Sequence, residues 1–397
     1  MKKIIIPVVF ALVGTCFTAY SFLDTFVIPK EYAGAYDASA GASNFSFSFA
    51  NMSNSSVHSS IPSSSSFSIS SSVSSQTSTS VPTSSITSSS SAVSSSSSQI
   101  DSSKYYEDLT PEQINALFTE QVVFEAKKHY SDPDIYIDIT TDRYVDRNGK
   151  EYSTYYLADI RIKNVGLLKT ALAHDKAGEN ITENTSDMCI RHRGIIAIDG
   201  DTYGAQKSGY VIRNGQKIRS SKNLSRRRPE DLAIYADGTF EIFNEKDCTL
   251  DEIAEKGAWQ VFSFGPGLVK DGVRIIETNE EVGTAATQNR NQRCAIGMVA
   301  PLHYIFLVSD GRIKESPGLS LYQIGRIMEE NHAYCAYNLD GGGSATMYFD
   351  DGTGNANGNG ALVNYCTQQL VDDRVPLPEA PKIEERGVSD CVYIGKE

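Results

Sequence analysis

Two aspartates and one arginine carry side chains that suit chemistry on a charged substrate, and the spacing of the aspartates fits a shared site. Asp199 and Asp201 flank Gly200 at the end of the short apolar run IIAI. Because residues two apart on an extended chain face the same side, the two carboxylates are predicted to converge on one site, although an ordinary Asp-Gly turn explains the same pattern. Arg293 precedes the apolar run CAIGM, and its planar guanidinium suits a phosphate or carboxylate, with a surface arginine as the alternative.

The most specific local signal is NLDGGGSATM at residues 338–347, in which Asp340 is followed by Gly341, Gly342 and Gly343 and then by Ser344 and Thr346. Consecutive glycines lose much backbone entropy on folding, so their presence indicates that something approaches the backbone closely. Successive N–H groups in such a turn can form a nest for an anion. Asp340 is then placed for chemistry or for orienting a ligand hydroxyl.

Several familiar motifs are absent or incomplete. No Gly-Lys-Ser/Thr follows the glycines, so the stretch is not a Walker loop, and Thr346 stands where a GxSxG elbow needs its last glycine. The run DDGTGNANGNG at residues 350–360 lacks the closing Glu of a calcium loop, which favours a mobile loop instead. VSDGR, which holds Asp310 and Arg312, is typical of any hairpin turn when taken alone.

The elements that must position these residues are mostly strands. Runs rich in β-branched and aromatic residues are separated by Asn-Gly and Asp-Gly turns, including a predicted hairpin at Asn148-Gly149. The predicted strands lie in IYIDITTDRYV, YYLADIRIKN, RGIIAIDG, GYVIRNGQKI, DLAIYADGTFEIF, WQVFSFGPGLVKDGVRI, CAIGMVAPLHYIFLVSDG and AYNLDGG. The sequence therefore predicts a sheet-dominated α+β fold, with a mixed sheet covered by a few helices.

Two helices are predicted around this sheet. LTPEQINALFTEQVVFEAKKH at residues 109–129 opens with a capping box, Thr110 with Gln113, and places proline at the first helical position. GLSLYQIGRIMEENHAY at residues 318–334 has apolar residues at helical spacing and leads into the strand that carries the three glycines.

The N-terminal quarter differs in composition from the rest of the 397-residue chain. Residues 4–23 form an almost uncharged apolar run after Lys2 and Lys3, long enough to cross a bilayer as a helix with the following chain outside the cytoplasm. A cleaved signal peptide is the alternative interpretation. Residues 38–100 are rich in serine and carry no Asp, Glu, Lys or Arg, which predicts a disordered tether.

Charge and cysteine content exclude some classes of function. The formal net charge is -13 and no basic stripe is present, so nucleic acid is not expected as a partner. Six cysteines follow Cys16 without a CxxC pair, so a structural zinc site is not expected, and both disulfides and buried free thiols remain open.

Taken in order, the motifs resemble those of the phosphodiester glycosidase family, to which the lysosomal uncovering enzyme belongs. The resemblance covers most of residues 180–397. The matching stretches are TENTSDM, IIAIDGDTYG, GYVIRNG, FSFGPGLVKDG, NQRCAIG, VSDGR, GLSLYQIGRIM, NLDGGGSATM and ERGVSDCVYI. Four positions depart from the usual pattern: Asp199 replaces Asn, Thr202 an aromatic residue, and Gln292 and Cys294 stand where Pro and Thr are common.

The resemblance implies a hydrolase that cleaves the sugar–phosphate bond of glycosyl phosphodiesters, and neither cofactor nor metal is expected. The apolar run and the serine-rich stretch add the expectation that this enzyme is exported and tethered to a membrane. Composition and pattern predict an anchor or signal peptide at 1–30, a disordered linker at 31–104 and a helix and strands at 105–178, and the resemblance predicts the glycosidase domain at 179–397. The expected catalytic residues are Asp199, Asp201, Arg293 and Asp340. The expected substrate-binding residues are Gly200, Gly341, Gly342, Gly343, Ser344, Thr346, Asp310 and Arg312.

Two other functions fit the same residues. One is a non-catalytic glycan-binding module at the cell surface that retains the pocket without turnover. The other is a phosphodiesterase that uses the aspartates as metal ligands, although no histidine motif accompanies them.

Overall fold

A computed structural model of the chain describes residues 27–32, 34, 36–37, 102–146, 148–225, 228–277, 290–353, 360–368, 376–379 and 382–396. The predicted anchor at 4–23, the serine-rich stretch at 38–100 and the centre of the 350–360 run lie outside these residues. Within the described residues, no helix combines the length and apolar composition needed to cross a membrane.

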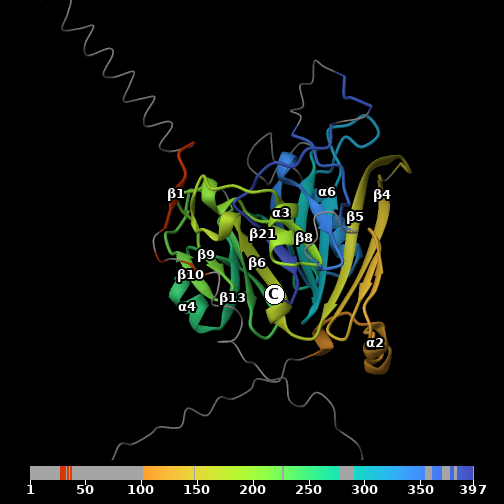
Figure 1. The fold of residues 1–397 in the computed structure, drawn as a ribbon, viewed down its shortest axis with the longest axis horizontal. Helices are drawn as coiled ribbons and strands as arrows, with labels where there is room; N and C mark the ends of the chain where they lie inside the picture. Colours follow the sequence, from red (N-terminus) through yellow and green to blue (C-terminus); the bar gives the residue numbers. More distant parts are fainter. Residues whose placement is uncertain are drawn as a thin grey trace, which may run out of the picture. The chain divides into compact units, whose positions relative to one another are not determined.

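Most of the described strands form three sheets (Figure 1). In spatial order, the nine-stranded sheet contains β15 (Val273–Arg274), β14 (Gly267–Lys270), β18 (Cys335–Gly341), β16 (Arg293–Ala300), β17 (His303–Ser309), β5 (Glu151–Ile162), β4 (Ile135–Val145), β3 (His129–Ser131) and β2 (Val123–Glu125). A five-stranded sheet contains β20 (Ala361–Leu362), β19 (Met347–Phe349), β8 (Ile196–Asp199), β21 (Asp390–Ile394) and β6 (Leu168–Leu172). The other five-stranded sheet contains β10 (Gln216–Arg219), β9 (Val211–Arg213), β13 (Ala258–Phe262), β11 (Glu230–Tyr235) and β12 (Phe240–Asn244).

The sheets are antiparallel rather than mixed. Every strand pairing within the described part of the chain is antiparallel, including the short pair of β1 (Lys30–Glu31) with β7 (Gly178–Glu179). The prediction of a mixed sheet is therefore wrong. Several consecutive strands are joined by tight turns, such as the predicted hairpin between β4 and β5, and a tight turn can connect only antiparallel neighbours.

The helix predicted at 318–334 is confirmed as α6 (Leu321–Glu330), but the first helix is shorter than predicted. The capping box of Thr110 with Gln113 is present, yet α2 (Pro111–Leu117) ends where Phe118 becomes extended. The remainder of the predicted helix includes β2, and Phe124 of this strand stacks on Phe349 with ring centroids 5.4 Å apart. Partial burial of this aromatic ring against the core and the β propensity of the preceding valines favour the strand.

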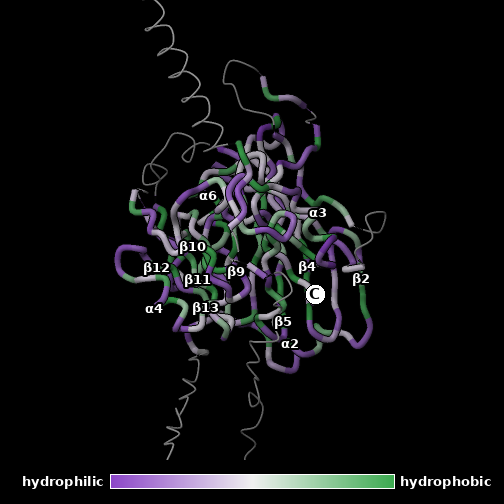
Figure 2. The backbone as a smooth tube through the Cα atoms, turned by 60° about the vertical axis from the view of Figure 1, so that its left-hand side comes forward, coloured by the Kyte–Doolittle hydropathy of each residue, from purple (hydrophilic) through white to green (hydrophobic). Residues whose placement is uncertain are grey.

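The main hydrophobic core lies between the sheets. Ile198 of β8, Ile137 of β4, Ile296 of β16 and Trp259 of β13 belong to one buried cluster. Figure 2 shows hydrophobic residues concentrated along the strands, for example around the labels β9, β11 and β13. The helices α6, α3 (Thr185–Arg191) and α4 (Leu250–Glu255) contribute to three separate clusters. All six cysteines after Cys16 are free thiols, and five of them are buried.

Candidate active site

The two acidic motifs meet where β8 and β18 end, although these strands belong to different sheets. The Asp340 N–H donates to the carbonyl of Gly200 at 3.0 Å. The Thr346 N–H donates to Oδ1 of Asp199 at 3.1 Å. These bonds tie the Asp-Gly-Asp turn to the glycine-rich turn and place the Asp199 and Asp340 carboxyl groups in electrostatic contact.

Asp199 is a fully buried carboxyl group with an incomplete set of hydrogen bonds. Its Oδ2 has no hydrogen-bond partner among the described residues, while the Cys294 thiol donates to its backbone carbonyl at 3.8 Å. Burial, followed by the negative charge of Asp340, raises the pKa of Asp199 well above its usual value. This environment favours the neutral acid, which is the form needed to donate a proton or a hydrogen bond.

Asp201 binds a different set of partners. Its Oδ1 accepts hydrogen bonds from Nη2 of Arg213 at 2.7 Å and from the Tyr203 N–H at 3.1 Å, and its Oδ2 accepts one from the Ser263 N–H at 2.7 Å. The same guanidinium donates through Nε to Asp390 at 2.8 Å, and all three charged side chains are fully buried. Asp201 and Asp199 therefore bind different groups, and their carboxylates do not converge on shared partners as the sequence predicts. The extended strand on which that expectation rested ends at Asp199.

Arg293 lies beside the glycine-rich turn, as the sequence predicts for a shared site. It opens β16 and pairs with Gly341 of β18 on one side and Ser309 of β17 on the other. Its Nε donates to the Leu319 carbonyl at 3.0 Å, which fixes the side chain. Burial and the neighbouring Arg312 lower the pKa of Arg293 to about 10, an effect that Asp340 opposes, so the guanidinium stays charged at neutral pH.

Because Gly341 and Gly342 have no side chains, other groups of the protein lie close to their backbone. A Cβ added at Gly341 would stand 2.9 Å from the Gln292 carbonyl oxygen, and one added at Gly342 would stand 2.7 Å from Nη2 of Arg312. Gly342 also has a φ of 63°, which favours glycine. Its N–H donates to Gln292 at 3.0 Å, so this amide is not available to the predicted anion nest.

The site contains a third arginine, Arg386, which the sequence analysis did not single out. Arg386 donates to Oδ2 of Asp340 at 3.1 Å, to the Gly341 carbonyl at 3.3 Å and to Oγ of Ser344 at 2.9 Å. Burial is the larger cause of the lowered pKa of Arg312, and the positive charge of Arg386 is the second. Arg293, Arg312 and Arg386 thus surround one turn, and their mutual repulsion is relieved when an anion binds among them.

The remaining predicted residues are buried and contact other parts of the domain. Asp310 accepts hydrogen bonds from the Tyr365 N–H at 2.8 Å and the Tyr156 hydroxyl at 3.2 Å, and burial raises its pKa to about 6. Oγ1 of Thr346 accepts a hydrogen bond from the Cys366 thiol at 3.5 Å. Gly200 and Gly343 are buried against neighbouring chain, because an added Cβ would meet the Asp390 carboxylate and the Gln368 Cα respectively.

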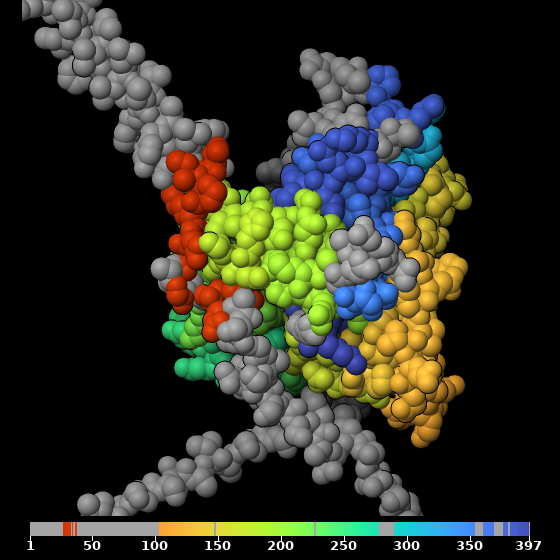
Figure 3. All heavy atoms as spheres, viewed as in Figure 1, coloured from red at the N-terminus to blue at the C-terminus, as the bar shows by residue number. Residues whose placement is uncertain are grey.

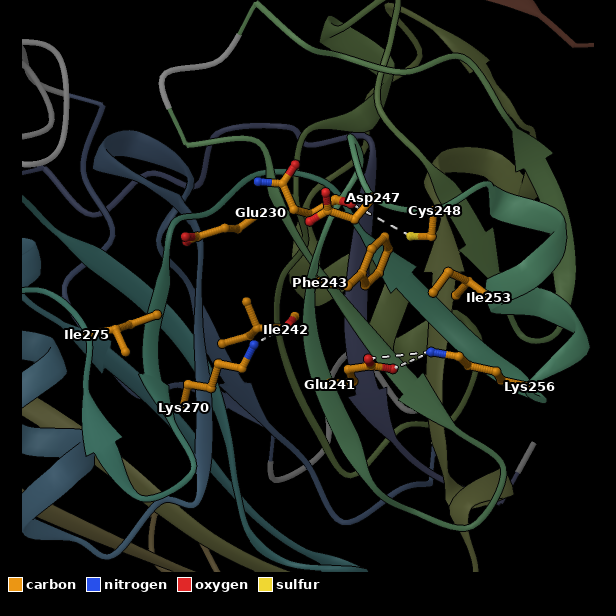
Figure 4. Close-up of a pocket in the computed structure, with 11 residues that line it drawn as sticks. Glu230, Glu241, Ile242, Phe243, Asp247, Cys248, Ile253, Lys256, Lys270 and Ile275 are labelled. Carbon is orange, nitrogen blue, oxygen red and sulfur yellow. Dashed lines mark hydrogen bonds and ion pairs between the residues drawn. The ribbon is translucent and has the colours of Figure 1, made fainter.

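The described residues contain no group of three or more His, Cys, Asp or Glu side chains that could hold a metal ion. A cavity of about 410 Å³ lies apart from the acidic motifs, among residues of β12, β14 and α4 (Figure 4). Lys256 pairs with Glu241 on its wall, and Lys270 donates to the Ile242 carbonyl at 3.2 Å. None of the predicted site residues lines this cavity.

Comparison with known proteins identifies the family. The family model described as phosphodiester glycosidase (NAGPA) matches residues 192–394, just over half of the chain, and the protein belongs to this family. The matched region contains the two aspartates of the site and its three arginines.

Individual relatives are more distant. A solved structure of the zebrafish N-acetylglucosamine-1-phosphodiester alpha-N-acetylglucosaminidase catalytic domain, auto-inhibited by its pro-peptide, is 20% identical, with a TM-score of 0.50 over 74% of this chain and 97% of that one, and supports the fold. A hypothetical protein from Synechocystis has a TM-score of 0.40 at 14% identity, covering 66% of this chain and 62% of that one. An uncharacterized SPbeta prophage-derived protein of Bacillus subtilis, YomE, is 26% identical over 42% of this chain, and the match spans 26% of that protein's length.

Proposed function

We propose that this protein hydrolyses the bond between the anomeric carbon of a sugar and the phosphate of a glycosyl phosphodiester. The observation that carries the proposal is the meeting of two carboxyl groups, Asp199 and Asp340, with three guanidinium groups at one buried turn. Such a substrate presents an anionic phosphodiester beside a carbon that becomes cationic in the transition state. A site for it needs cations and acids side by side.

The arginines bind the phosphodiester in this mechanism. Arg293 is fixed by its bond to Leu319, and Arg386 by its bonds to Ser344 and Asp340. Guanidinium groups held in place before the substrate arrives stabilise charge that develops on the departing phosphate. The phosphate is also a better leaving group than an alcohol, so much of the catalysis depends on this anion site.

The two carboxyl groups take different parts. Asp199, whose neutral form is favoured by burial, donates its proton to the phosphate oxygen as the bond to the anomeric carbon breaks. Asp340 acts as the carboxylate that supports the positive charge at that carbon, and the water that completes the reaction gives up its proton there. Both carboxylate oxygens of Asp201 accept hydrogen bonds from protein groups, so Asp201 stabilises the fold and takes no part in the chemistry.

The decisive experiment measures sugar release from a panel of synthetic sugar 1-phosphodiesters. We expect turnover by the wild type, loss of turnover in Asp340→Asn and Arg293→Lys, and normal turnover in the control Asp251→Asn, whose carboxylate is exposed on α4. Thermal unfolding of each variant separates lost chemistry from lost folding. Saturable binding of the same compounds without release by the wild type would instead identify a glycan-binding module.

We further propose that the domain is exported and remains attached to a membrane through residues 4–23. The apolar run after Lys2 and Lys3 and the charge-free serine-rich stretch support this location. Carbonate extraction of membranes and protease treatment of intact cells test it. Recovery of the full chain in the cytoplasmic fraction would refute it.

A further inference from the structure

The residues that precede the serine-rich stretch are docked on the domain. We propose that the described residues 27–32, 34, 36 and 37 form a strap that holds the N-terminal part of the chain on the domain. On this view the described residues on both sides of the serine-rich stretch are attached to the domain, and the stretch does not set the distance between the domain and the N-terminus. The strap belongs to the same compact unit as the sheets, and Figure 3 shows it in red against the green residues of the domain.

Backbone pairing carries the first half of the strap. Lys30 and Glu31 form β1 and pair antiparallel with Glu179 and Gly178 of β7. The next residue, Tyr32, donates its N–H to the Ala177 carbonyl at 2.6 Å. These bonds extend the pairing by one residue and fix its register.

Aromatic side chains and a second set of hydrogen bonds carry the other half. Tyr32 and Tyr36 pack on a buried cluster of Leu172, Ala177, Tyr203 and Val211. The Tyr36 hydroxyl accepts a hydrogen bond from Nδ2 of Asn214 at 3.2 Å, and burial raises the pKa of Tyr36 to about 12.

Backbone atoms of Asp37 complete the docked segment. The Asp37 N–H donates to Gln216 Oε1 at 2.8 Å, and the Gln216 amide donates to the Asp37 carbonyl at 2.9 Å. The glutamine side chain thus pairs with the strap as a neighbouring strand would.

The domain contains a position shaped to admit the strap. A Cβ added at Gly178 would overlap the Lys30 carbonyl oxygen, a backbone atom that cannot move unless β1 separates from β7. The φ of Gly178 is not in the left-handed region, so its own conformation does not call for glycine. The close approach of another backbone explains its presence.

The chain is also docked on the far side of the serine-rich stretch. Glu107 forms a paired salt bridge with Arg161 at 2.6 and 3.1 Å, and Tyr106 stacks on His332 with ring centroids 3.6 Å apart. A flexible chain of this length, free at one end, would have a root-mean-square span of about 45 Å. Because the chain is docked on the domain both before and after the serine-rich stretch, this span does not set the distance between the domain and the N-terminus. Only residues 24–26 separate the predicted anchor from the strap, so the domain is held next to whatever the N-terminus is attached to.

The test cuts the loop in the full-length protein. A site-specific protease sequence is inserted between Ser75 and Gln76, the chain is cleaved to completion in detergent, and the two pieces are separated by size exclusion. We expect the N-terminal fragment to elute with the domain in the wild type and to separate from it in denaturant. Elution apart from the domain in the native wild type would overturn the proposal.

Two variants and one control sharpen this result. Tyr36→Ala removes an anchor on the strap itself and leaves the domain sequence intact, and Gly178→Val blocks β1 from the domain side. Both should convert retention of the fragment into separation. Tyr106→Ala removes an aromatic contact on the other side of the cut and should leave retention unchanged. If Tyr36→Ala and Gly178→Val retain the fragment as well as the wild type, the strap is not what holds it. Thermal unfolding of each variant checks the domain.

Discussion

Asp199 and Asp201 stand two residues apart, yet the structure predicts opposite consequences when either is changed to asparagine. Burial and the charge of Asp340 raise the pKa of Asp199, which favours the neutral acid, and its Oδ1 accepts a backbone hydrogen bond from Thr346. An asparagine retains this acceptor and replaces one neutral group by another. We expect Asp199→Asn to change the free energy of unfolding by about 1 kcal/mol or less and to abolish sugar release, because the amide cannot give up a proton.

Asp201→Asn should do the reverse. Its carboxylate accepts two bonds at 2.7 Å, from Arg213 and from the Ser263 N–H, and a third at 3.1 Å from the Tyr203 N–H. An amide nitrogen on either side would face a donor, and the buried guanidinium would lose one of its two carboxylate partners. Breaking a buried pair from one side costs about 3–5 kcal/mol. For a domain of this size that lowers the melting temperature by about 6–15 °C.

The assay pairs calorimetric unfolding with sugar release measured well below the lowest melting temperature. Under these conditions Asp201→Asn should retain substantial turnover while Asp199→Asn has none. The reasoning is refuted if Asp201→Asn melts like the wild type and is inactive, or if Asp199→Asn melts many degrees lower. The first result would make Asp201 a catalytic residue, and the second would make Asp199 part of the frame.

Three further changes test other parts of the site. Burial raises the pKa of Asp310 to about 6 in the folded protein, so the folded state binds its proton more tightly than the unfolded state. The stability of the wild type relative to Asp310→Asn should therefore fall by about 2 kcal/mol between pH 4 and pH 6 in urea unfolding curves. A pH-independent difference would contradict this. Gly342→Ala, at a φ of 63° and in the path of the Arg312 guanidinium, should lower stability by about 1–2 kcal/mol and weaken substrate binding, measured as a higher KM. Sugar release should persist in excess EDTA, whereas its loss and recovery on adding a divalent metal would favour the metal-dependent reading.

The sequence predicts the elements well where local pattern and burial agree. Alternating residues and Asn-Gly or Asp-Gly turns predict strands such as β4, β5 and β17, and α6 buries the four apolar residues that its spacing indicates. The short helices α3 and α4 have seven and six residues, too few turns for a clear periodicity. The predicted first helix is too long because Val122 and Phe124 fit an apolar helical stripe as well as they fit a strand.

Two features of the site depend on tertiary structure and could not be read locally. The orientation of Asp201 changes because the strand ends at Asp199 and Thr202 takes a φ of 56°, which a strand pattern does not encode. Arg386 reaches Asp340 from a segment without regular secondary structure. Its only signal is its position in ERGVSDCVYI, a stretch matched to the family without attention to the arginine.

The three glycines show how the anion site is built. The sequence suggests that a ligand approaches their amides, but the groups that come close to Gly341 and Gly342 are the Gln292 carbonyl and the Arg312 guanidinium. The absence of side chains therefore brings a cation against the turn from one side, while Arg386 binds the turn through Gly341 and Ser344. We therefore expect an anion at this turn to bind the guanidinium groups rather than the amide of Gly342, which already donates to Gln292. Removing one arginine should thus weaken phosphodiester binding more than any change that only alters the amides, and it should do so without moving the carboxyl group of Asp199, whose hydrogen bond from Thr346 is independent of all three arginines.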